Sequence, residues 1–240
     1  MEVAYFDKIN RVVLPFFQTL IFSFTAYFII SKRKKVTLQE ILLFCFWLVA
    51  AIIFFLLFLM LFLYHFFSFP LEFTYFFLLL IWFFRSILVF LAFLFFLSKI
   101  SLNNLIKIIL ASLFGGLIFF AFFSYFKTGQ VCIKLGDPYF CSPFEKEGMF
   151  FLLIIIFLNF LFFSWAIRTD ILKKNITWEN FSLVYHYFAF FLFLFFHFAR
   201  ILYFFYFFPR PPIMDLFYFL IPYLVYLAKK EELKIKHEKS

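Results

Sequence analysis

Apolar residues fill seven long stretches of the chain, and polar residues gather between them. A helix needs about 20 residues to cross a hydrocarbon core about 30 Å thick, and the stretches approach or exceed that length. They are Val12–Ile30, Ile41–Phe67, Phe73–Leu97, Leu105–Phe126, Met149–Ile167, Phe181–Phe208 and Ile213–Ala228. We therefore predict an all-α polytopic membrane protein in which residues 1–240 form one domain of seven transmembrane helices.

The residues between the spans include local indications of where helices begin and end. Thr37 and Glu40 have the spacing of a capping box, in which each side chain accepts a hydrogen bond from the other's backbone N–H. Pro70, and the prolines at 209, 211 and 212, lack the N–H that a continuing helix needs. We expect a capping box ahead of the second span, and outer turns at the two proline sites.

Basic residues set the predicted orientation. The run Lys32–Lys35 follows the first span directly, and such clusters stay on the cytoplasmic side of a membrane. With the N-terminus outside and the C-terminus cytoplasmic, fourteen Lys and Arg residues lie in cytoplasmic segments and six lie outside, while Arg85 and Arg200 fall within spans. In this orientation residues 127–148 form an extracytoplasmic loop and residues 229–240 a charged cytoplasmic tail. The first span is then expected to be an uncleaved anchor.

The composition narrows the class of protein. Hydrophobic residues make up 67% of the chain, and 52 of the 240 residues are Phe, which is more apolar surface than a water-soluble domain of this length could bury. The net charge of +9 does not indicate nucleic-acid binding, because the cations stand in short blocks at span ends, where they meet anionic lipid headgroups. We expect membrane lipids as partners, no nucleic acid, and residence in a prokaryotic cell (inner) membrane.

Two of the three cysteines lie in the predicted outer loop. Cys132 and Cys141 flank the sequence Gly-Asp-Pro at 136–138, which favours a turn that would let them meet, and an extracytoplasmic compartment favours their oxidation. We predict a disulfide between them; the alternative is two free thiols. Cys45, inside the second span, is expected to be an inert buried thiol.

Arg85 lies near the middle of the third span. A central arginine costs about 2.5–3.5 kcal/mol on insertion scales, so it should face the bundle interior and have a partner there. All carboxylates lie in loops, tails or near span ends. The candidate partners are Asn159 of the fifth span, tyrosine hydroxyls, backbone carbonyls, a water-bridged carboxylate or a bound anion. Two interpretations stay open: a structural arginine satisfied by protein and water, or a binding site for a ligand or lipid headgroup.

The sixth span has polar and small residues along one face. His186, Ala189, His197 and Arg200 fall at helical spacings, while the rest of the span is mainly Phe, Leu and Tyr. This face should look inward, either as a hydrogen-bonded packing surface or as the wall of a cavity for water or a ligand. We also predict an ion pair between Arg200 and Asp215, which start at similar depth on adjacent antiparallel helices. The alternative is that Arg200 reaches the headgroups alone.

No catalytic or metal-binding motif is present. The sequence lacks the patterns of metalloproteases, serine hydrolases, P-loops and dinucleotide-binding folds, so we predict no enzyme activity, no metal site and no cofactor. Two pairs of small residues, Ala111 with Gly115 and Ser112 with Gly116, would let another helix approach the fourth span closely. That helix could belong to this chain or to another membrane protein subunit.

Two hypotheses for the function follow. The first is a non-enzymatic membrane protein, a sensor or an assembly or scaffold subunit, that binds a small or lipidic anion or a partner subunit. The second is a transporter or channel component in which the same polar groups line a path. The candidate binding residues are Arg85, Asn159, His186, His197 and Arg200. A continuous polar cavity open to one side favours the second hypothesis; a closed, Phe-packed bundle with an exposed small-residue groove favours a subunit or scaffold.

Overall fold

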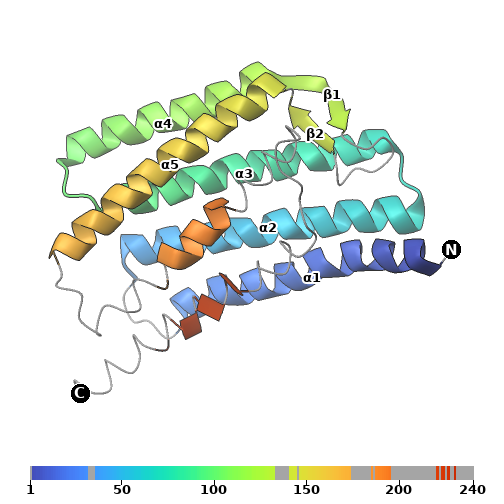
Figure 1. Ribbon diagram of the computed structural model, residues 1–240, viewed down its shortest axis with the longest axis horizontal. Helices are drawn as coiled ribbons and strands as arrows, with labels where there is room; N and C mark the ends of the chain where they lie inside the picture. Colours follow the sequence, from blue (N-terminus) through green and yellow to red (C-terminus); the bar gives the residue numbers. More distant parts are fainter. Residues whose placement is uncertain are drawn as a thin grey trace.

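Five long antiparallel helices form the main part of the structure, a computed structural model (Figure 1). It describes residues 2–31, 36–132, 141–144, 146–173, 185, 187–195, 220–221, 223–224, 226–227 and 230. The helices are α1 (Glu2–Ile30), α2 (Leu38–Phe67), α3 (Leu71–Lys99), α4 (Asn104–Tyr125) and α5 (Lys146–Lys173). We call the end where α1, α3 and α5 finish the basic end, because Lys99, Lys107 and Arg168 lie near it.

The first five predicted spans are confirmed as long apolar helices. Within the described residues, five helices are long and apolar enough to cross a membrane: Val12–Ile30, Leu38–Phe67, Phe73–Lys99, Asn104–Ser124 and Phe150–Thr169. These helices are compatible with an integral membrane protein. Residues 187–195 are helical within the sixth predicted span, as are the described residues between 220 and 227 within the seventh. The count of seven spans and the orientation of the termini stay predictions.

The turns around α2 and α3 form as the sequence predicts. The Thr37 hydroxyl accepts the Glu40 N–H at 3.3 Å, and the Glu40 carboxylate accepts the Thr37 N–H at 2.9 Å. At the other end of α2, Ser68 adopts a left-handed conformation with φ 51°, and Pro70 precedes the first residue of α3. The capping box and the proline break are therefore confirmed, and the short turn that contains Ser68 and Pro70 joins the antiparallel helices α2 and α3.

Helix α1 is longer than the predicted span. It begins at Glu2, whereas the apolar pattern begins at Val12. Hydropathy identifies only the part that suits lipid, but residues 2–11 contain neither Gly nor Pro, so nothing local ends the helix. Pro15 lies inside α1, where its missing N–H is tolerated as in other transmembrane helices.

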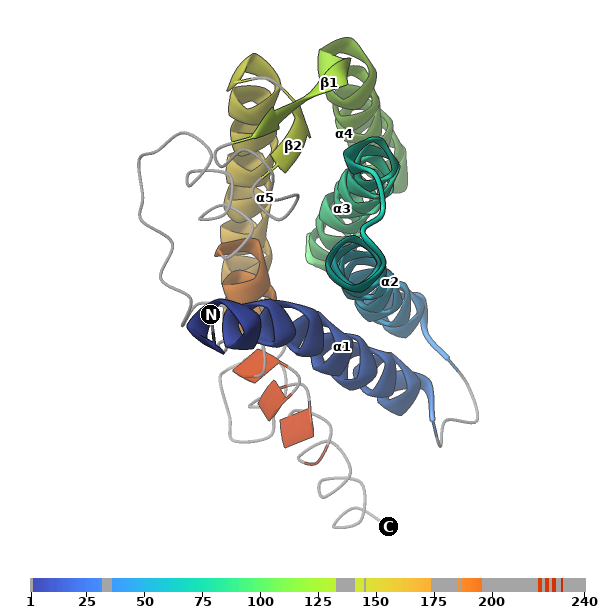
Figure 2. The same ribbon diagram turned by 90° about the vertical axis from the view of Figure 1, so that its right-hand side faces the viewer.

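Two hydrophobic cores hold the helices together, and α3 and α5 contribute to both. One core joins α1, α2, α3, α5 and residues 187–195, and the other joins α3, α4 and α5. In the first, Phe22 of α1 stacks on Trp47 and Phe54 of α2, with ring centroids 5.6 and 5.2 Å apart. Residues 187–195 lie beside α5 (Figure 2), where the rings of Phe163 and Tyr187 are 5.8 Å apart.

A short antiparallel hairpin connects α4 to α5 at the end opposite the basic end (Figure 2). Its strands are β1 (Phe126–Cys132) and β2 (Cys141–Phe144). Phe126 pairs with Phe144, and an irregularity follows before the pairs Val131–Ser142 and Cys132–Cys141. The predicted fourth helix therefore ends one residue early, at Tyr125, because Phe126 belongs to the sheet ladder. Hydropathy could not separate the two, since Phe suits both structures.

The predicted orientation can be tested with the acceptor sequence Asn175-Ile176-Thr177. This segment should be cytoplasmic, so we expect Asn175 to stay unmodified when the chain is inserted into microsomes. An acceptor sequence engineered into residues 133–140, on the predicted outer side, should be glycosylated and serves as the control. Gel mobility before and after glycosidase treatment reads out both sites. A glycan on Asn175 would invert the assigned orientation.

Candidate functional site

Arg85 lies midway along α3, about 21 Å from each end at 1.5 Å per residue. Its side chain is buried, with 5% of its surface exposed. The guanidinium carbon lies 4.8 Å from the centroid of the Trp82 ring, one turn earlier on α3, which is within the range of a cation–π interaction. The bundle thus encloses a cation at the depth where a charge is most costly to leave in lipid.

A small cavity lies beside Arg85, between α3, α4 and α5. Its lining residues are Trp82, Arg85, Ser86, Val89, Ile118, Leu152, Ile155 and Ile156. The cavity volume is about 20 Å³, and a buried water needs about 10–15 Å³ of open volume. The space therefore suits one water molecule and is too small for a polyatomic anion or a lipid headgroup.

Asn159 connects α5 to α3 close to Arg85. It is fully buried, and its Nδ2 donates to the backbone carbonyl of Val89 at 3.1 Å. Val89 lies one turn beyond Arg85 on α3. The Oδ1 atom of Asn159 is buried and receives no hydrogen bond from the described residues. Asn159 does not line the cavity beside Arg85. Arg85 and the point where Asn159 contacts α3 are therefore one turn apart, and the two residues do not form two walls of one pocket.

The remaining candidate residues belong to the sixth and seventh predicted spans. His186, His197 and Arg200, together with Asp215, lie outside the described residues. Of the predicted inward face, Ala189 is described, and it is fully buried. The role of that face and the ion pair between Arg200 and Asp215 stay predictions.

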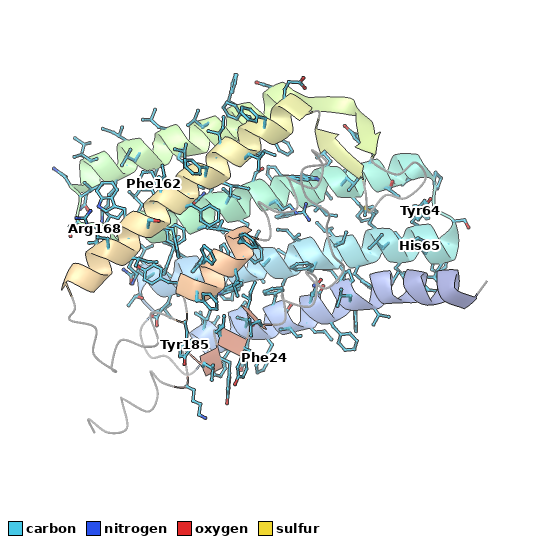
Figure 3. All side chains as sticks on the ribbon, in the orientation of Figure 1. Phe24, Tyr64, His65, Phe162, Arg168 and Tyr185 are labelled. Carbon is cyan, nitrogen blue, oxygen red and sulfur yellow. The ribbon has the colours of Figure 1, made fainter. Side chains whose placement is uncertain are left out.

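No metal centre forms among the residues that the structure describes. Nowhere in them do three His, Cys, Asp or Glu side chains lie close enough to hold a metal ion. His65 lies near the end of α2 away from the basic end (Figure 3), with its ring 5.1 Å from the ring of Tyr64. The predicted absence of a metal and a cofactor stays a prediction for the chain as a whole.

Three buried polar residues were not singled out from the sequence. Gln18 and Thr25 of α1 and Thr74 of α3 are each less than 5% exposed. Thr25 Oγ1 donates to the Ile21 carbonyl at 2.8 Å, which satisfies the hydroxyl within its own helix. An isolated polar residue in an apolar span is the indication that drew attention to Arg85, and it could have identified these residues too.

The hairpin places Cys132 directly opposite Cys141. Opposed residues of antiparallel strands have Cα atoms about 4.5–5.5 Å apart, and most disulfides join Cα atoms about 4.4–6.8 Å apart. The backbone register thus suits the predicted bond. Both side chains lie outside the description, so the disulfide itself stays a prediction.

We expect Cys132 and Cys141 to resist alkylation in denaturing detergent until a reductant is added. In the chain-entropy model, a disulfide that closes a ten-residue loop stabilises the fold by about 2.7 kcal/mol. Because the reductant opens the disulfide, mass spectrometry should count two more labelled thiols after reduction than before. Cys45, which is a free thiol, is the internal control and should be labelled in both samples. Labelling of all three cysteines without reductant would contradict the disulfide.

The two small-residue pairs of α4 have different surroundings. A Cβ on Gly115 would lie 3.3 Å from the Phe90 ring, so the pair of Ala111 and Gly115 lets α3 pack closely. A Cβ on Gly116 would meet no described atom within 4 Å, and Ser112 is exposed. Only 17% of the α4 span is buried, against 50% of the α3 span. The pair of Ser112 and Gly116 therefore lies on the outer surface of the bundle.

Comparison with known proteins places the chain in no family. No protein-family model, curated protein or solved structure matches it significantly. We therefore infer a function for the chain from its packing and from the geometry around Arg85.

Proposed function

We propose that the chain is a non-enzymatic integral membrane protein that serves as an assembly or scaffold subunit. The supporting observation is the packing around Arg85: among the described residues, aromatic and aliphatic side chains form the two cores, and the space beside Arg85 has a volume of about 20 Å³. A transporter or channel component needs a polar path wide enough for its substrate. The cavity beside Arg85 is instead water-sized and lined mainly by apolar side chains.

The partner of such a subunit is another membrane protein, and α4 is the first helix on which to look for it. It is the least buried of the five spans. The open space at Gly116 would let a second helix approach, since small residues allow close contact between helix backbones in a membrane.

The test is purification of the tagged chain in mild detergent, followed by mass spectrometry of the proteins that accompany it. We expect one membrane protein at a fixed ratio. Gly116→Leu should reduce its recovery about tenfold, because a larger side chain forced into a close-packed contact costs about 1–3 kcal/mol. Ser164→Leu, an equally bulky replacement at an exposed position of α5, is the control and should leave recovery unchanged.

Two results would count against this proposal. If the chain alone, reconstituted in liposomes, carries labelled anions across the bilayer, the transporter hypothesis replaces it. If the accompanying protein is recovered equally with Gly116→Leu and with the wild type, α4 is not the contact surface. Melting temperatures of both variants in detergent verify that the bundle itself is intact.

A further inference from the structure

The cavity beside Arg85 is enclosed by three helices and lined mainly by apolar side chains. Trp82, Arg85, Ser86 and Val89 line it from α3, and four aliphatic side chains line it from α4 and α5. Of these described lining residues, Arg85 alone is charged. Because its side chain is 5% exposed, the positive charge lies inside the bundle, next to the cavity.

The guanidinium of Arg85 can donate hydrogen bonds to an occupant of the cavity in addition to its other contacts. Its central carbon lies 4.8 Å from the centroid of the Trp82 ring, and a cation–π contact requires no hydrogen-bond acceptor. A guanidinium has several N–H donors in a planar fork, more than one neighbouring acceptor can use. An occupant that accepts hydrogen bonds therefore has donors available at Arg85.

Acceptors are scarcer than donors in the described lining. The Ser86 hydroxyl already donates its proton to the Trp82 carbonyl, at 3.1 Å. The backbone carbonyls here serve α3 itself, and that of Val89 also accepts from Asn159 Nδ2. A buried water makes about three hydrogen bonds and must place both of its protons, for which these lining residues offer one side-chain acceptor, the Ser86 oxygen. The lining therefore favours an occupant that has no protons of its own.

The negative charges of α1 to α5 stand far along the helices from Arg85. Every acidic residue of these five helices lies within two turns of a helix end. On α3, Glu72 is 13 residues before Arg85, or about 19.5 Å at 1.5 Å per residue. Glu147, in the first turn of α5, is exposed. Because a buried charge is costly unless it is paired, an anion in the cavity would stabilise Arg85 at a depth that these carboxylates do not share.

The size of the cavity limits the anion to a single atom. Its volume of about 20 Å³ exceeds the 10–15 Å³ or so that a water requires, which leaves room for an ion slightly larger than water. Chloride is such an ion, and it loses less hydration than fluoride when it enters an apolar space. It accepts hydrogen bonds from any direction, so it can use whichever N–H groups of Arg85 face the cavity.

We propose that the cavity between α3, α4 and α5 is a binding site for one chloride ion, which Arg85 holds through its charge and its N–H groups. The ion would neutralise the central arginine and link α3 to the aliphatic walls that α4 and α5 supply. The site does not depend on the partner contact proposed for α4, because Gly116 is not among the residues that line it.

The test is the chloride dependence of unfolding, measured with the full chain in mixed detergent micelles. Sodium gluconate replaces sodium chloride at constant sodium concentration, because the polyatomic gluconate ion is too large for the cavity. One ion that binds only the folded state raises the folding equilibrium constant about tenfold for each tenfold rise in its concentration above the dissociation constant. We expect the wild type to approach this dependence.

Two variants separate the charge from the space. Arg85→Leu removes the cation, whereas Val89→Ile adds one methylene to the cavity wall and leaves Arg85 in place. The folding equilibrium of both variants should no longer change with chloride. Phe83→Leu, at an exposed position of α3, is the control and should keep the wild-type dependence. If Arg85→Leu does not fold, Val89→Ile alone decides the outcome.

Four results would overturn the site. A wild type whose stability is the same in chloride and in gluconate would mean that the cavity holds water only. Chloride dependence that persists in Arg85→Leu would place the ion elsewhere. Dependence that persists in Val89→Ile would mean that the ion does not occupy this cavity. Loss of the dependence in Phe83→Leu would show that it follows general stability and not a site at Arg85.

Discussion

Arg85→Leu is expected to weaken the folded bundle by about 2 kcal/mol while making α3 easier to insert into a membrane. An isolated α3 would expose the arginine to lipid at a cost of about 2.5–3.5 kcal/mol. The bundle removes that exposure, since Arg85 is 5% exposed and lies over the Trp82 ring. Leucine can be exposed to lipid without this cost. The variant therefore loses the free energy gained by removing the charge from lipid, together with the cation–π contact.

Arg85→Leu is expected to lower the stability of the bundle and to improve the insertion of α3. These opposite effects make the prediction specific. Unfolding in mixed detergent micelles measures the stability of the full chain, and a microsome assay measures insertion of the α3 segment alone. Phe83→Leu is the control, because Phe83 is 40% exposed and its replacement should change the unfolding free energy by less than about 1 kcal/mol. If Arg85→Leu leaves the bundle as stable as the wild type, shelter of the charge does not help hold the helices together.

Phe22→Ala is expected to lower the free energy of unfolding by about 2–3 kcal/mol, and Phe24→Ala by less than about 0.5 kcal/mol. Phe22 is fully buried and stacks on Trp47 and Phe54, whereas Phe24, two residues away, is 62% exposed. Lipid surrounds separated helices as well as folded ones, so transfer from water contributes little. The remaining cost is the cavity, about 100 Å³ at about 24 cal/mol per Å³.

The same micelle titration measures both phenylalanine variants. They remove the same atoms from the same helix, so their difference isolates packing from any change in helix propensity or in insertion of α1. Phe22→Leu should recover part of the loss by filling part of the space. Equal effects at the two positions would mean that α1 does not dock on α2 through the ring of Phe22.

The sequence predicted the first five helices because each apolar span is long enough to cross a membrane. Thr37 and Pro70 marked their helix ends correctly, since capping and the missing proline N–H act within a few residues of chain. The sequence predicted a turn that would let Cys132 and Cys141 meet, and the structure places the two residues opposite each other. The two strands themselves were not predicted, because hydropathy contains no information about strand register. The longer α1 was missed because charged and amide residues interrupt the apolar pattern of its first ten residues.

The sequence by itself determined that Arg85 must be enclosed, because its position in α3 leaves it too far from water. The Trp82 ring, one turn earlier on the same helix, is a local contact. Only the tertiary structure decided the rest of what encloses Arg85: a water-sized cavity, and a hydrogen bond from Asn159 to Val89 one turn away. The same holds for Gly115 and Gly116, adjacent in sequence, of which one meets α3 and the other lies open. The physical reason is that these spans are apolar on every side, so hydrophobicity does not identify the inward face of a helix. That face is chosen by the fit of side chains between helices that are far apart in the sequence.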